Sequence, residues 1–153
     1  MTNKGEKHGS PQDRADGPGY ALHEQIGFFL RQANQRHVAI FASLINDKLT
    51  TTQWAALTKL RDVQPCSQNQ LGREIAMDVA TIKGVVDRLV KRGLVSTEPD
   101  RTDARRLVLS LTEDGHAAIA ENVERALQVS EQTLSPLTPA ERLMLLELLR
   151  KIS

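Results

Sequence analysis

Apolar side chains recur at steps of three and four residues along much of the chain, which is the spacing of one face of an α-helix. The first such stretch runs from Tyr20 to about Asp47 and predicts one long helix. Its apolar stripe consists of Ile26, Leu30, Ala33, His37, Phe41 and Leu44. A stripe of this kind is expected to pack against another helix.

Capping residues predict two shorter helices after this one. The two capping boxes are Thr50 with Gln53 and Ser67 with Gln70. The first predicts a helix that ends at about Val63, and the second a helix over Gln68 to about Ala76. A tight turn is expected at Met77-Asp78.

A fourth helix is predicted from Val79 to Arg92, with Asp78 as its N-cap and Gly93 after its C-terminus. Four residues form its buried face, namely Ile82, Val85, Val86 and Leu89. The residues left on its outer face are Thr81, Lys83, Gly84, Asp87, Arg88 and Lys91.

A β-hairpin and two more helices complete the chain. Residues 94–98 and 106–111 are predicted to form two short strands, and the turn-rich, basic segment 99–105 joins them. A long helix is expected after Thr112, to about Thr133, and a last one from the capping box and proline of residues 138–141. The last helix carries apolar residues on more than one face, which favours burial against a partner chain.

The order of these elements predicts a winged helix-turn-helix: a mostly α fold with a small β-hairpin wing. The second helix of such a motif enters the major groove of double-stranded DNA, and the wing reaches an adjacent minor groove. Lys83 is expected to donate to guanine, Ala80 and Thr81 to touch thymine methyl groups, and Gly84 to permit close approach. Arg73, Arg88 and Lys91 are expected to contact phosphates, and Arg101 to enter the minor groove.

Charge and composition agree with this interpretation. Residues 67–106 hold eight Lys/Arg and six Asp/Glu, whereas residues 107–153 hold four and seven. The single cysteine, Cys66, excludes an intrachain disulfide and a cysteine-based zinc cluster, and it fits a reducing cytoplasm. Residues 1–19 are predicted to be a disordered tail, and no apolar run is long enough to span a membrane.

Three segments resemble the MarR-type (multiple antibiotic resistance) regulators. The run 100–106 (DRTDARR), followed by 109–115 (LSLTEDG), is closely similar to the family's wing signature. The run 86–95 (VDRLVKRGLV) resembles the end of its recognition helix, and 49–54 (LTTTQW) the start of its second helix. The resemblance covers roughly residues 27–152, with the motifs in the family's order.

The resemblance implies a homodimer that binds a pseudo-palindromic operator, with the first and last two helices intertwined as a dimerisation lobe. It implies that Asp103 orients Arg105 and braces the wing, with Arg105 also at the DNA. The expected organisation is then a tail (1–19), a dimerisation and ligand helix (20–47), a DNA-binding domain (48–112) and C-terminal dimerisation helices (113–153).

Many relatives bind aromatic carboxylates beside the first two helices, so the resemblance also implies a small aromatic or heteroaromatic acid as effector. The candidate ligand residues are Arg31, Asn34, His37, Thr52 and Trp54, with His23 contributed by the partner subunit. The alternative for His37 and Trp54 is a role in the core, and for Arg31 a solvated or dimer-contacting position. The function expected is a ligand-responsive repressor.

Other functions were weighed against this one. None of the nucleophile-elbow, P-loop, GxGxxG or HExxH motifs is present, so no enzyme activity is expected. The spacing of His23, His37 and His116 matches no tight metal-ligand motif, so no metal or cofactor is expected. A redox-sensing repressor remains the alternative, with the pKa of Cys66 lowered by the dipole of the third helix.

Overall fold

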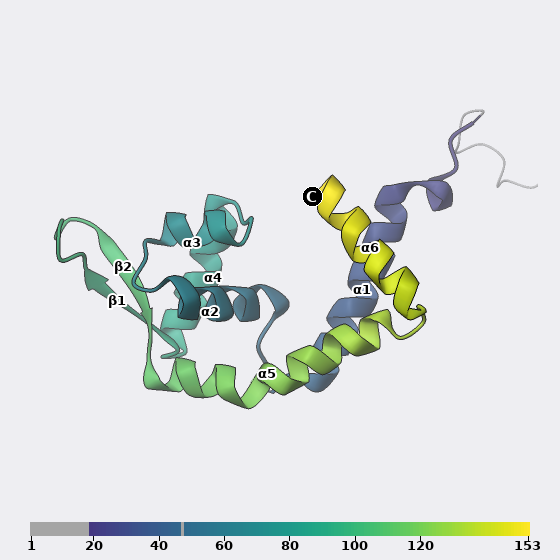
Figure 1. Ribbon diagram of the computed structural model, residues 1–153. Helices are drawn as coiled ribbons and strands as arrows, with labels where there is room; N and C mark the ends of the chain where they lie inside the picture. The colour runs from purple at the N-terminus through teal and green to yellow at the C-terminus, as the bar shows by residue number, and fades with distance from the viewer. Residues whose placement is uncertain (1–18, 47) are drawn as a thin grey trace, which may run out of the picture. The chain divides into compact units, whose positions relative to one another are not determined.

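The computed structural model describes residues 19–46 and 48–153, which belong to two units, 1–35 and 36–153. The elements are η1 (Leu22–Glu24), α1 (Ile26–Leu44), α2 (Thr51–Val63), α3 (Gln68–Glu74), α4 (Val79–Lys91), β1 (Val95–Pro99), β2 (Leu107–Leu111), α5 (Glu113–Leu134) and α6 (Pro139–Ile152). The predicted fold class is confirmed: the described part of the chain is mostly helical with one β-hairpin (Figure 1).

The first helix is shorter than predicted at both ends. A 3₁₀ turn precedes it, and Gln25 between the two is extended, with φ −84° and ψ 140°. The Gln25 side chain donates from Nε2 to the main-chain oxygen of Ala21 over 3.0 Å, which stabilises this break. The helix ends at Leu44, and the predicted end at Asp47 lies outside the described residues.

The third helix also ends early, and the predicted turn is displaced. Ala76 adopts a left-handed conformation with φ 54°. Its amide donates to the oxygen of Arg73 over 3.3 Å, and the amide of Met77 donates to that of Gly72 over 2.9 Å. These two bonds form a Schellman motif, so the turn falls at Ile75–Ala76 rather than at Met77-Asp78. The position is filled by alanine, without the glycine that usually marks this motif.

Local caps fix the other helix starts as predicted, although Ser67 caps α3 only by accepting from the Gln70 amide and the predicted box of Ser67 with Gln70 is not complete. Thr50 and Gln53 form a complete capping box, and so do Thr138 and Glu141. The helix α4 starts at its predicted residue after the N-cap Asp78.

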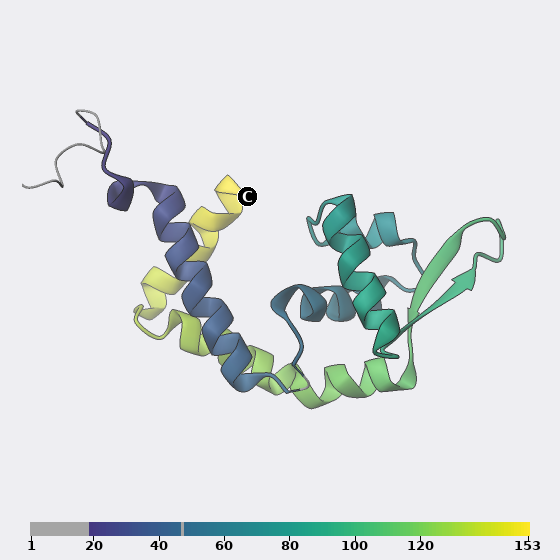
Figure 2. The same cartoon turned by 180° about the vertical axis from the view of Figure 1, so that it is seen from behind.

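The core of the winged part lies between α2, α3, α4 and the hairpin. Its fully buried side chains include Leu57, Leu60, Leu71, Ile82 and Leu89. The predicted buried face of α4 is confirmed at all four positions. The antiparallel strands pair Val95 with Leu111, and Figure 2 shows the hairpin projecting beyond α3 and α4.

The helix α5 begins against the end of α4. Thr112 caps α5 through Gly115 and donates its hydroxyl to the oxygen of Gly93 over 2.6 Å. A Cβ at Gly115 would lie 2.1 Å from the main-chain oxygen of Leu94, so only glycine allows this approach. Gly93 itself has a φ of 72°, as its place after α4 requires.

Many apolar side chains of α6 are exposed in this chain. Leu143 and Ile152 are 73% and 67% exposed, and none of the residues of α6 is buried. No helix in residues 19–46 and 48–153 is both long and apolar enough to cross a membrane.

Candidate nucleic-acid interface

The outer face of α4 is open, and its first turn is rigidly capped. The carboxylate of Asp78 accepts from the Thr81 amide over 2.8 Å and from the Thr81 hydroxyl over 2.6 Å. These bonds, the side-chain one first, lower the pKa of Asp78, so the cap is ionised at neutral pH. The predicted base-contacting residues Ala80, Thr81 and Lys83 are all exposed on this helix.

Two of the predicted contacts are engaged within α4 itself. Lys83 donates from Nζ to the carboxylate of Asp87 over 2.6 Å, one turn further along the helix. Arg88 folds back to donate to the main-chain oxygen of Gly84 over 3.1 Å, and its guanidinium lies over that glycine. An exposed ion pair one helical turn apart, such as that of Lys83 with Asp87, contributes about 0.3–0.5 kcal/mol, so DNA can displace it at small cost.

Other predicted DNA contacts carry unpaired charges. Within residues 19–46 and 48–153, the side chains of Arg73, Lys91 and Arg101 have no acidic partner. Two residues beside Lys91, Lys48 and Arg92, were not expected there: a hollow of about 340 Å³ is lined by Lys48, Gln53, Arg88, Lys91 and Arg92. The four cations among these residues, Lys48, Arg88, Lys91 and Arg92, form a basic cluster. Only the packing of α2 on α4 brings Lys48 to this cluster, so no sequence motif indicates that Lys48 belongs to it.

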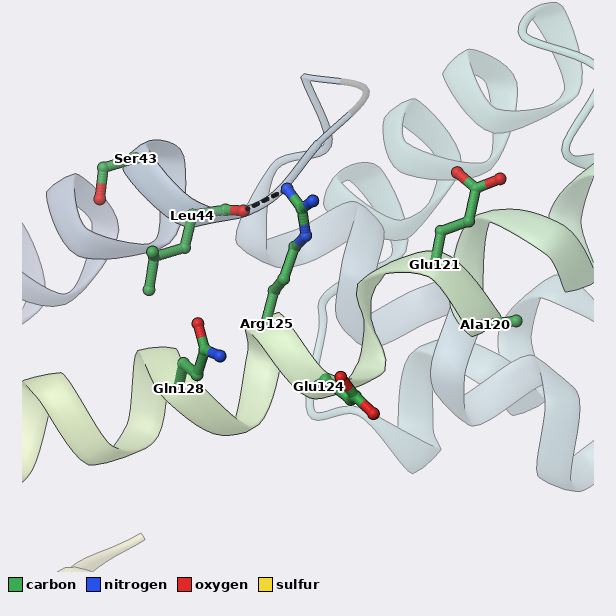
Figure 3. A pocket seen from close by; sticks show the side chains of 7 residues that line it. All are labelled: Ser43, Leu44, Ala120, Glu121, Glu124, Arg125 and Gln128. Atoms are coloured by element: carbon green, nitrogen blue, oxygen red, sulfur yellow. Dashed lines mark hydrogen bonds between the residues drawn. The ribbon is translucent and has the colours of Figure 1, made fainter.

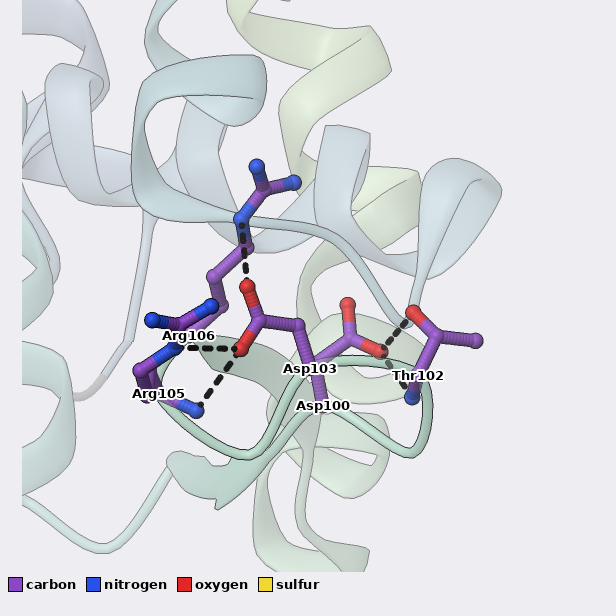
Figure 4. A network of polar contacts seen from close by, with 5 residues as sticks. All are labelled: Asp100, Thr102, Asp103, Arg105 and Arg106. Carbon is purple, nitrogen blue, oxygen red and sulfur yellow. Dashed lines mark hydrogen bonds and ion pairs between the residues drawn. The ribbon is translucent and has the colours of Figure 1, made fainter.

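The loop of the wing is ordered by two aspartates (Figure 4). Asp100 accepts from the amide and the hydroxyl of Thr102, each over 2.7 Å, and these bonds lower its pKa. Asp103 pairs with Arg105 over 3.2 Å, which is the contact the sequence suggested, and with Arg106 over 3.4 Å. Both arginines stay exposed, so the loop presents its positive charges to solvent.

The predicted effector residues fall in both units. In the first unit, His23 lies in η1, Asn34 is exposed on α1, and Arg31 stacks over the ring of Phe28 at 5.5 Å. In the second unit, half-buried Thr52 and Trp54 lie in the first turn of α2, and Trp54 packs against the core.

His37, also in the second unit, is held against α5. Its Nδ1 lies 3.0 Å from Oγ1 of Thr133, and that hydroxyl donates to the oxygen of Val129 over 2.7 Å. Because a hydroxyl has one proton, Nδ1 of His37 must be the donor. In the neutral ring, Nε2 is therefore a free acceptor.

Another site that the sequence did not predict lies where α1 ends against α5 (Figure 3). Arg125 donates to the main-chain oxygen of Leu44 and to Asn46, and the fully buried Asn122 accepts from the amide of Asn46 over 2.8 Å. The hollow beside them, of about 490 Å³, is lined in part by Glu121 and Glu124. These carboxylates disfavour an acidic ligand there, and none of the predicted effector residues lines it.

The alternative of an activated Cys66 finds no support in the structure. The side chain is 2% exposed, and its main chain pairs with Leu109 beside the hairpin. Burial, and then the charge of Glu74, raise the pKa of the thiol. The strand packed over it outweighs any effect of the neighbouring helix, because the thiolate loses its solvation. In the described part of the chain, no three His, Cys, Asp or Glu side chains are grouped to hold a metal ion.

Comparison with known proteins relates the chain to one family of DNA-binding regulators. The MarR family profile matches residues 49–107. The HTH-type transcriptional repressor NicR of Pseudomonas putida is 40% identical over 99% of this chain and 95% of its own length. A crystal structure of a "probable transcriptional regulator" from Pseudomonas aeruginosa is 51% identical, with a TM-score of 0.82 over 87% of this chain and 100% of that one. Bordetella bronchiseptica BpsR, whose DNA binding is regulated by 6-hydroxynicotinic acid, is 43% identical, with a TM-score of 0.82 over 89% and 97% of the two chains. The chain therefore belongs to the MarR family of transcription regulators.

Proposed function

We propose that the protein is a homodimeric repressor that binds a pseudo-palindromic operator and releases it on binding a small heteroaromatic acid. The observation that carries the DNA-binding part is the open outer face of α4. Ala80, Thr81, Lys83, Arg88 and Lys91 are exposed there. Their charges and the exposed wing suit a major groove and its flanking phosphates.

The homodimer is supported by apolar surface that the single chain leaves uncovered. In α6, Leu143, Met144, Leu148 and Ile152 are each about half exposed or more. Apolar side chains concentrated on one helix in this way mark a protein–protein interface. Two recognition helices would then have to lie roughly 34 Å apart to enter successive major grooves.

The effector class is supported by BpsR, which is 43% identical and is regulated by 6-hydroxynicotinic acid. In this chain we assign its carboxylate to Arg31 and its polar ring atoms to Asn34 and His37. Nε2 of His37 is free to accept, because Nδ1 is committed to Thr133. Thr52 and Trp54 are assigned to the wall of the site, and His23 to a contribution from the partner subunit.

The DNA-binding proposal is tested by fluorescence anisotropy with overlapping duplexes from upstream of the protein's own gene. We expect one fragment to bind specifically, with an affinity that falls steeply as salt rises. Arg101→Ala and Lys83→Ala should each weaken this binding while leaving the circular dichroism spectrum unchanged. If both variants bind like the wild type, the groove assignments are wrong, and if no fragment binds, the function is wrong.

The effector proposal is tested with 6-hydroxynicotinic acid on the protein–operator complex, with benzoic acid for comparison. Trp54 is the only tryptophan of the chain, so its fluorescence reports binding directly. If the acid raises the Kd for operator DNA by roughly 30- to 150-fold, the coupling free energy between acid binding and DNA binding is roughly 2–3 kcal/mol. Arg31→Ala and His37→Ala should keep DNA binding and lose this release. A normal response in both variants contradicts the site.

A further inference from the structure

The first residue of α4 exposes an apolar side chain that nothing in the described fold covers. Val79 is 68% exposed, whereas Ile82, Val85, Val86 and Leu89 on the same helix are at most 4% exposed. An isolated exposed valine is ordinary on a protein surface. This one stands at the N-terminal end of the helix that follows the turn of a helix-turn-helix, where side chains meet base edges.

The polar groups beside Val79 are held away from it. The hydroxyl of Thr81 donates to Asp78, so its proton is already used within the cap. Lys83, which follows Val79 by one turn on the same face, is drawn toward the C-terminus by Asp87. In the protein without DNA, the front of the first turn therefore presents the methyl groups of Val79 and Ala80, and no uncommitted side-chain hydrogen-bond donor.

The major-groove edge of a base pair offers one apolar group, the C5-methyl of thymine. We propose that Val79 contacts a thymine methyl group and is a specificity-determining residue for an A·T pair in each half-site. The inference rests on the proposed DNA-binding function and extends it from the groove to one chemical group. The methyl contacts expected from the sequence were those of Ala80 and Thr81 only.

The experiment replaces each thymine of the bound duplex, one at a time, by deoxyuridine. This change removes only the methyl group and leaves base pairing intact. We expect wild-type protein to lose about fourfold in affinity at one thymine per half-site, the effect of returning one methyl-sized group to water. For Val79→Ala the thymine and deoxyuridine duplexes should bind equally at that position, because the partner of the methyl group is gone.

Val90→Ala is the matched control. Val90 lies in the last turn of the same helix, is 38% exposed, and loses the same two methyl groups. This variant should keep the wild-type penalty for deoxyuridine. Val79→Thr preserves the branched shape and one methyl group, and should retain part of the penalty.

The outcomes separate this inference from the function on which it rests. Specific binding with no deoxyuridine penalty at any thymine, or with a penalty that Val79→Ala leaves unchanged, overturns the role of Val79 alone. Failure of wild-type protein to bind any duplex overturns the proposed function and this inference together. A penalty abolished by Val79→Ala and kept by Val90→Ala supports it.

Discussion

Replacing Gly84 by alanine is expected to stabilise the folded protein and, at the same time, to weaken its hold on DNA. Gly84 lies inside α4, where glycine costs about 1 kcal/mol relative to alanine. A Cβ built there would meet nothing closer than Nη1 of Arg88 at 3.6 Å, which is ordinary contact. The substitution therefore gains helix propensity without a clash, and for a chain of this size 1 kcal/mol raises Tm by about 2–4 °C.

On DNA the same methyl group has the opposite effect. If the backbone at Gly84 approaches the duplex closely, the added Cβ overpacks that contact by about 1–3 kcal/mol, or roughly 5- to 150-fold in Kd. Thermal melting at fixed protein concentration gives the first quantity, and operator anisotropy the second. Gly27→Ala is the control, since its Cβ likewise meets no clash, with nothing within 4 Å, and it lies far from α4 in sequence.

Two results would refute this reasoning. A fall in Tm for Gly84→Ala means that the space around Gly84 is not open. Unchanged operator affinity means that the duplex does not approach this face of α4 closely.

Four further outcomes are expected. Gly115→Ala should destabilise the protein by about 3 kcal/mol or more in urea unfolding, because its Cβ collides with the oxygen of Leu94; a loss under 1 kcal/mol would contradict the packing. Asp78→Asn keeps the cap but does not titrate. Since folding lowers the pKa of Asp78, its charge stabilises the fold above the ordinary value of 3.8, and this contribution is lost as pH falls through the lower folded value. The wild-type advantage in urea unfolding should therefore shrink from pH 7 to pH 3, and a constant difference would count against it. Lys91→Gln should reduce the slope of log Kd against log salt by about 1.8 for the dimer, which is about 0.9 for each of the two ammonium groups if each neutralises one phosphate. Peroxide should leave operator binding intact, because burial raises the pKa of Cys66; release that Cys66→Ser abolishes would restore the redox alternative.

The starts of the helices after α1 followed from the sequence because a cap joins residues only three positions apart. Thr50 with Gln53, and Thr138 with Glu141, form the boxes that their spacing indicated. The buried face of α4 and the order of the elements followed from apolar periodicity, because this pattern also involves only residues close together in the sequence. These features need no knowledge of what packs against them.

Features that depend on distant partners did not follow. The end of α3 at a left-handed Ala76 was missed because no glycine marks it. The binding of Asn122 and Arg125 to the end of α1 joins residues more than 75 positions apart. The base-contact assignments covered Ala80, Thr81, Lys83 and Gly84 and did not include Val79, whose exposure only the structure shows.

The sequence by itself determined the winged helix-turn-helix, its recognition helix and its family, because each rests on short-range patterns of apolar, capping and turn residues. Tertiary structure alone decided the state of Cys66 and the grouping of Lys48 with Lys91. The solvation of a thiol, and the field of a cluster of cations, are set by what the rest of the chain brings within a few ångströms of them. The local sequence does not determine which of these groups come so close.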